Sequence, residues 1–312
     1  MKHGSETSVP GPVAASRRMD IEIDAEGGVR LRGWLFRPAA RGLRPAITLA
    51  HGGAAVKEHG LDRLGAWLAA AGFVVLVHDH RGFGASEGVP RQDADPWRQV
   101  ADWRRVISWL EAQPGVDAHR IGVWGSGDAG GHAIVLGATD RRLRAIVAQA
   151  PLISGRHARR RTPSPDDALA LELALAEDER AQFRGEPPAR RAIVSARPDI
   201  AAAHHSTQAI DFYLRRLPPG AWDNHVTLRS ARAAQLYEPG AWIEQVTPAA
   251  LMMIVADEDA VHPPELARAA FAQANEPKRL VTLPGGHFDM HGSQFERAAE
   301  AALDWFRAHL GG

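Results

Sequence analysis

Three short segments of the chain carry residue types that together could perform acyl-transfer chemistry. The first is a glycine-rich turn, Gly122–His132, with the sequence GVWGSGDAGGH. The second contains Asp259 and the third contains His287, and each follows an apolar run. A histidine in such a turn can act as a general base, while an acid fixes its tautomer and stabilises the imidazolium. We therefore expect a catalytic site assembled from these three segments.

The tip of the glycine-rich turn lacks the hydroxyl that a nucleophile would supply. Its centre is Gly125-Ser126-Gly127-Asp128-Ala129, and the position expected for a nucleophilic serine is Gly127. Glycine has no nucleophilic group, so no acyl-enzyme can form there. Ser126 is one candidate replacement, although its side chain should point away from the tip. A water molecule held by His287 is another candidate.

Asp128 opens further alternatives. If the frame moves by one residue, Asp128 takes the place of the nucleophile. The chemistry would then be that of a haloalkane dehalogenase or an epoxide hydrolase. In the unshifted frame it is an additional carboxylate at the border of the pocket, where burial could make it an acid or a base. Two other hypotheses stay open. The chain is a non-catalytic ligand-binding protein that has lost its nucleophile, or Gly127 replaces the serine of an esterase.

A second glycine-containing loop supplies candidate donors for an oxyanion. His51-Gly52-Gly53-Ala54 follows an apolar run, and the backbone N–H groups of Gly53 and Asp128 are the expected donors. The candidate substrate-binding residues are His51, Gly52, Ala54, Tyr213, Trp222 and Trp242. The three aromatic residues among them could line the pocket or pack one part of the chain against another.

The elements that must position these residues can be predicted from hydrophobic patterning. Six short apolar runs are nearly continuous, as in strands buried on both faces of a parallel sheet. They are residues 46–51, 73–79, 121–125, 144–150, 250–257 and 278–284. Amphipathic helical stretches lie between several of them, and residues 19–38 predict a hairpin before the first. The alternation predicts an α/β fold with a doubly wound, mostly parallel sheet.

One interval is too long for a single crossover helix. Residues 152–248 separate two predicted core strands, and we expect them to form an inserted helical cap over the carboxyl edge of the sheet. The core then comprises residues 19–151 and 249–312. Residues 1–18 are polar and contain two prolines, which predicts a disordered leader.

These segments resemble those of α/β-hydrolases, in the bacterial group related to dienelactone hydrolases and to X-Pro dipeptidyl-peptidases and cocaine esterases. The resemblance covers about residues 20–310 and includes DHRGFGASEG (79–88), VADEDAVHPPELA (255–267) and LPGGHFD (283–289). It implies that Asp259 and His287 match the acid and the base of the family. It also implies that Gly127 stands where the family has its nucleophilic serine, and that Asp128 stands where the family has an aromatic residue. An enzyme acting on a small or medium ester, thioester or lactone is implied.

Composition limits the partners and the chemistry. Lys plus Arg and Asp plus Glu both number 37, so we expect a small-molecule substrate and neither nucleic acid nor membrane as a partner. The chain has no cysteine, which excludes disulfides and thiolate metal sites. Several histidines could be imagined as metal ligands, but their spacing predicts no metal site, and no cofactor is expected. We expect a cytoplasmic protein, and the sequence leaves a homodimer open.

Overall fold

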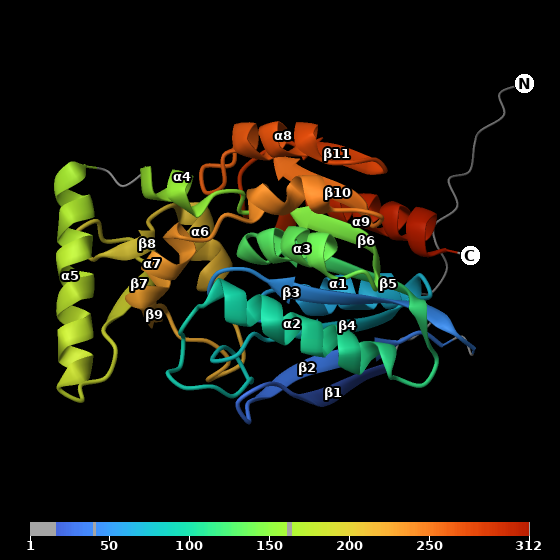
Figure 1. Cartoon of the computed structure of the whole chain (residues 1–312), viewed down its shortest axis with the longest axis horizontal. Coiled ribbons are helices and arrows are strands. Elements are labelled where there is room, and N and C mark those ends of the chain that lie inside the picture. Colours follow the sequence, from blue (N-terminus) through green and yellow to red (C-terminus); the bar gives the residue numbers. More distant parts are fainter. Residues whose placement is uncertain (1–16, 40–41, 161–163, 312) are drawn as a thin grey trace, which may run out of the picture.

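The computed structural model describes residues 17–39, 42–160 and 164–311. An eight-stranded sheet with the order β1-β2-β4-β3-β5-β6-β10-β11 forms the centre of the molecule (Figure 1). Its strands are β1 (Arg17–Asp24), β2 (Arg30–Arg37), β3 (Arg44–His51), β4 (Val74–His78), β5 (Val116–Ser126), β6 (Leu143–Gln149), β10 (Ala250–Ala256) and β11 (Lys278–Leu283). The six strands from β4 to β11 in this order run parallel, whereas β2 is antiparallel to both of its neighbours. The predicted α/β fold with a doubly wound, mostly parallel sheet is confirmed.

Helices cover both faces of this sheet (Figure 1). Those of the core are α1 (Leu61–Ala70), α2 (Pro96–Glu111), α3 (Asp128–Thr139), α8 (Pro264–Gln273) and α9 (Phe295–Leu310). Apolar side chains of α1 and α9 pack in one buried cluster, and those of α2, α3 and α8 pack in another. Strand β10 is buried along its whole length, because both of its faces are covered. This two-sided burial explains its continuous apolar sequence.

The insertion lies beyond one end of the sheet (Figure 1) and contains strands as well as the helices that we predicted for the cap. Its elements are α4 (Gly155–Arg160), α5 (Pro165–Phe183), β7 (Arg190–Val194), β8 (Ala202–His204), α6 (Thr207–Tyr213), β9 (His225–Thr227), α7 (Arg229–Gln235) and the 3₁₀ helix η1 (Pro239–Gln245). Three of them form a second sheet in the order β8-β7-β9. Strands of three to five residues are too short to show a hydrophobic period, which is why the sequence did not reveal them.

The predicted leader, residues 1–18, extends too far along the chain. Residues 1–16 of the expected leader lie outside the described residues, but Arg17 and Arg18 already belong to β1 and pair with Arg37 and Phe36 of β2. Among the helices of the described residues, none is long and apolar enough to cross a membrane.

A buried ion pair holds the loop after β3 against the loop after β4. The Lys57 ammonium lies 2.6 Å from Asp79 and 2.7 Å from Glu58, and the Lys57 N–H also donates to Asp79. The side chains of Lys57 and Asp79 are 4% and 0% exposed. Charges buried this deeply are tolerated only when they are paired. The pair therefore fixes the loop that also contains Gly52 and Gly53.

Replacing Lys57 by methionine should lower the free energy of unfolding by about 3–5 kcal/mol, because Asp79 would be left buried without its partner. Urea denaturation measures the change. The matched control is Arg63→Met, which removes an exposed pair with Glu296 and should cost about 0–1 kcal/mol. Equal losses in the two variants would contradict a structural role for the buried pair.

Candidate active site

A single residue forms the turn between β5 and α3. Strand β5 ends at Ser126 and α3 begins at Asp128, with Gly127 between them at φ 63° and ψ −126°. Residues with a Cβ adopt such a conformation only at a cost. The Gly127 N–H donates to Gln149 of β6 and its carbonyl accepts N–H groups of α3. The tip of the turn is thus Gly127, and the shifted frame with Asp128 at the tip is not adopted.

Two other glycines allow close backbone packing at this turn, Gly52 between the loop after β3 and α3, and Gly125 between β5 and α3. A Cβ on Gly52 would lie 2.2 Å from the backbone nitrogen of Asp128, and one on Gly125 would lie 2.0 Å from the carbonyl oxygen of Ala129. No side chain fits at either position. The loop backbone therefore lies beside the first N–H of α3. Within the described residues, the N–H groups of Gly53 and Asp128 have no acceptor, as oxyanion donors require.

Asp259 and His287 are joined as the sequence predicts. Both follow the carboxyl ends of neighbouring strands, and His287 Nδ1 lies 2.8 Å from Asp259 Oδ2. The other carboxylate oxygen accepts the backbone N–H groups of Val261 and His262. Burial raises the pKa of Asp259, but the hydrogen bond and charge of His287 outweigh burial and hold the pKa below its usual value. The ionised acid fixes the tautomer in which Nε2 is the free, basic nitrogen of His287.

The free nitrogen of His287 faces the position where the nucleophile is missing. A Cβ on Gly127 would lie 3.8 Å from His287 Nε2. A serine hydroxyl, or a water oxygen in the same place, would come within hydrogen-bonding distance of this nitrogen. Acid, base and tip therefore have the geometry of a catalytic triad from which only the hydroxyl is missing.

His262 is a second imidazole at this point, and the sequence prediction missed its position. Its Cε1 would lie 3.9 Å from a Cβ on Gly127, and its ring is perpendicular to that of His287 at a centroid distance of 4.8 Å. Nδ1 lies 2.8 Å from the carbonyl oxygen of Ala150, to which it can donate. Burial and the charge of His287 lower the pKa of His262. The spacing Asp259-x-x-His262 was the available signal, because a carboxylate often caps the N–H three residues later.

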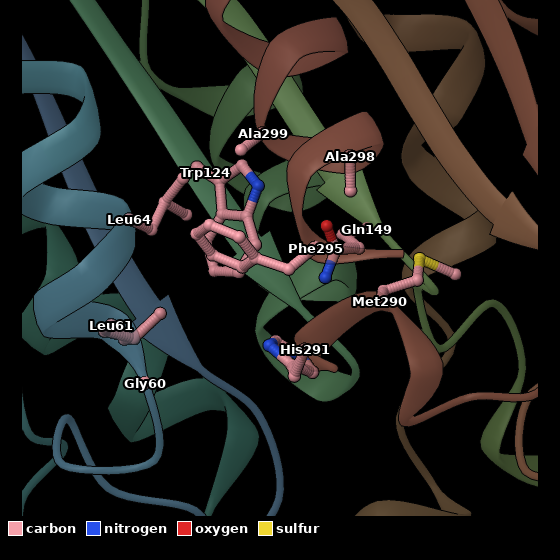
Figure 2. Close-up of a pocket in the computed structure, with 10 residues that line it drawn as sticks. All are labelled: Gly60, Leu61, Leu64, Trp124, Gln149, Met290, His291, Phe295, Ala298 and Ala299. Atoms are coloured by element: carbon pink, nitrogen blue, oxygen red, sulfur yellow. The ribbon is translucent and has the colours of Figure 1, made fainter. Parts of the chain in front are cut away.

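Ser126 points to a different neighbour. Its Oγ lies 2.9 Å from Nε2 of His291, in the short helix η2 (Asp289–His291), and the side chain is buried. Figure 2 shows His291 with Trp124 and Gln149 around a small hollow that neither Gly127 nor His287 lines. The expectation that Ser126 points away from the tip agrees with this geometry. Ser126 is therefore hydrogen-bonded to His291 and not to the Asp259–His287 pair.

His51 lies on the same side as Ser126, and its assignment as a substrate-binding residue stays a prediction. It is 3% exposed, and its ring centroid lies 5.0 Å from that of His291 and 5.9 Å from that of Phe212. Burial, followed by the charge of His291, lowers its pKa well below the usual value. His51 ends β3 with its ring packed in the interior, so only the loop that follows it reaches the candidate site.

Side chains of the insertion approach the loop after β3, which contains Gly53. A Cβ on Gly53 would lie 3.3 Å from Asp128 Oδ2 and 3.4 Å from the hydroxyl of Tyr213. The Trp222 indole N–H donates to the carbonyl of Ala54 at 2.7 Å, and its ring stacks on that of Tyr213. Tyr213 and Trp222 therefore lie next to the candidate site, and their contact with a substrate stays a prediction.

Trp242 does not lie next to the candidate site. It packs against the cluster on the α2 side of the sheet, and its ring centroid lies 6.2 Å from that of Trp97. Of the two roles considered for it, the structure favours packing of the insertion against the core. Among the described residues, no three His, Asp or Glu side chains gather in a way that could hold a metal ion.

Comparisons with known proteins agree with this architecture. A family model described as X-Pro dipeptidyl-peptidase (S15 family) matches residues 26–289. The polyketide transferase grgF of Penicillium is 29% identical over 94% of this chain and 97% of its own. The crystal structure of the alpha/beta hydrolase GrgF covers 95% of this chain and 100% of its own, with a TM-score of 0.81 and 27% identity. The α/β-hydrolase fold is thereby established.

Two further relatives carry different functional names. The quorum-quenching protein AidA of Acinetobacter baumannii is 28% identical over 93% of this chain and 94% of its own. A thiohydrolase of Eupenicillium brefeldianum is 27% identical over 94% of both chains.

Replacing Gly127 by serine should create a nucleophile that His287 activates, because the added hydroxyl would come within reach of Nε2. We expect the variant to react covalently with a fluorophosphonate probe, whereas the parent protein does not. The positive φ makes the substitution cost about 1–3 kcal/mol of stability. Mass spectrometry locates the label. Labelling of Ser126 in the parent protein would contradict this view of the turn.

Four histidines with lowered pKa values should make the protein sensitive to mild acid. Burial lowers the pKa of His59, His80 and His204 to about 4 and that of His291 to about 3. The unfolded chain binds protons on these groups near pH 6.5 and the folded chain does not, so stability falls as pH drops below 6.5. Between pH 7.5 and 5.5 each contributes a loss of about 1 kcal/mol. Urea unfolding at both pH values tests this, and an unchanged midpoint would refute it.

Proposed function

The chain belongs to the X-Pro dipeptidyl-peptidase (S15) family, and we propose that it hydrolyses a small or medium ester, thioester or lactone without an acyl-enzyme. The observation that carries the proposal is the free nitrogen of His287, backed by Asp259 and 3.8 Å from the Cβ position of Gly127. The relatives named thiohydrolase favour a thioester among these substrates.

The proposed reaction uses water in place of a serine. His287 Nε2 takes a proton from the water while the water oxygen attacks the carbonyl carbon of the substrate. The negative charge that develops on the carbonyl oxygen is stabilised by the N–H groups of Gly53 and Asp128. The tetrahedral intermediate then collapses with cleavage of the bond to sulfur or oxygen, and the imidazolium returns its proton to the leaving group. Asp259 stabilises the imidazolium throughout.

The alternatives have less support. A dehalogenase or epoxide hydrolase would need the Asp128 carboxylate at the tip of the turn, but Asp128 is the first residue of α3. A non-catalytic binding protein has no need of a hydrogen-bonded acid–base pair aimed at the tip. Such a pair is what hydrolysis by water requires.

Hydrolysis of a p-nitrophenyl ester or an N-acetylcysteamine thioester is expected to fall by about 10²–10⁴-fold in His287→Ala, because the general base is removed. Activity of the parent protein should resist fluorophosphonates, since no serine is acylated. The matched control is His309→Ala, in the last turn of α9, which should retain activity. Activity that survives His287→Ala, or that a fluorophosphonate abolishes in the parent protein, would overturn the mechanism.

A further inference from the structure

We propose that Asp128 and Tyr213 form a subsite for a hydrogen-bond donor, a hydroxyl or an ammonium, carried by the acyl group of the substrate a short distance from its carbonyl. The inference extends the proposed function, on which it rests for the identity of the occupant. Its basis is that a carboxylate and a hydroxyl from two separate parts of the chain both lie next to the Gly53 backbone.

The Asp128 carboxylate and the Tyr213 hydroxyl both lie close to the Gly53 backbone. The point that a Cβ would take on Gly53 is 3.3 Å from Asp128 Oδ2 and 3.4 Å from the Tyr213 hydroxyl oxygen. Gly53 has a positive φ of 60°, which favours glycine, so the two polar atoms approach its backbone with no side chain between them. Because Gly53 is also a candidate oxyanion donor, a group bound to these two atoms would lie near the scissile carbonyl.

Neither polar side chain is satisfied by the protein. In residues 17–39, 42–160 and 164–311, no hydrogen bond or ion pair reaches the Asp128 carboxylate or the Tyr213 hydroxyl. Tyr213 is 6% exposed as a whole residue, but its hydroxyl oxygen is not among the buried polar atoms that lack a partner, so it stays accessible to a bound group. An ionised carboxylate can only accept hydrogen bonds, whereas a phenol can also donate. A hydroxyl or an ammonium on the ligand satisfies the carboxylate, and a hydroxyl also satisfies the phenol.

The pair is held rigidly. Asp128 begins α3, where the helix dipole stabilises a negative charge. The Tyr213 ring stacks with those of Trp222 and His204 at centroid distances of 5.6 and 6.1 Å. Burial and the charge of Asp128 raise the pKa of Tyr213, so its hydroxyl keeps its proton. A site with fixed partners can discriminate strongly against a ligand that leaves them unpaired.

Charge supplies a second reason for this selectivity. A carboxylate beside the oxyanion donors repels the negative charge that develops on the substrate carbonyl. A neutral hydrocarbon group cannot relieve that repulsion. A hydroxyl that donates to Asp128, or an ammonium next to it, offsets the carboxylate charge while the tetrahedral intermediate forms. The subsite therefore favours donor-bearing acyl groups in the transition state as well as in the bound complex.

The test compares three N-acetylcysteamine thioesters of equal chain length: butanoyl, 3-hydroxybutanoyl and 3-aminobutanoyl. For the parent protein, kcat/KM should be about tenfold or more higher for at least one donor-bearing acyl group than for butanoyl. Asp128→Asn should reduce that preference to about twofold or less, partly by raising hydrolysis of the butanoyl thioester. Tyr213→Phe should weaken the preference for the hydroxyl and leave that for the ammonium. The matched control, Asp304→Asn on the exposed side of α9, should keep the parent preference.

Binding separates this inference from the proposed function. The corresponding amides, butanamide, 3-hydroxybutanamide and 3-aminobutanamide, are compared by ligand-observed NMR with the parent protein and Asp128→Asn. If no thioester is hydrolysed but a donor-bearing amide binds more tightly through Asp128, the subsite stands and the proposed reaction fails. Hydrolysis without any preference among the three thioesters, or a preference that persists in Asp128→Asn, overturns the subsite.

Discussion

The contact between the Gly52 backbone and the first N–H of α3 is the constraint on which the rest of the site depends. A single Cβ at Gly52 would come within 2.2 Å of the Asp128 nitrogen, so the two backbones touch without any side chain between them. This contact brings the loop after β3 to the turn at Gly127, and the buried Lys57–Asp79 pair holds the same loop from its other end. Donors of the loop and the helix are thereby placed within reach of one ligand.

The sequence predicted the positions of Asp259 and His287 because strand ends in a parallel sheet share one edge. Continuous apolar runs are visible without knowledge of contacts, and the residue types that follow them are few. The turn could be located for the same reason, since glycines at 125 and 127 are required by the backbone and stand at fixed distances from the strand. Local rules of this kind account for the core sheet and for the acid–base pair.

The sequence could not predict contacts that depend on how the insertion packs. Strands β7, β8 and β9 are too short for a period to show, and the choice between packing and pocket lining for Trp242 depends on which helix it meets. The positions of the His51 and His262 rings could not be predicted for a similar reason. A ring at a strand end can turn into the interior or out to the edge, and only the neighbouring side chains decide which.

The positive φ at Gly127 has a consequence for how such a protein can change over time. In a hydrolase with serine at this position, the turn holds a side chain in a backbone conformation that costs about 1–3 kcal/mol. Glycine adopts the same conformation freely. Glycine at this position is therefore expected to be more stable than serine, and the difference is a reserve that can offset destabilising substitutions elsewhere in the chain.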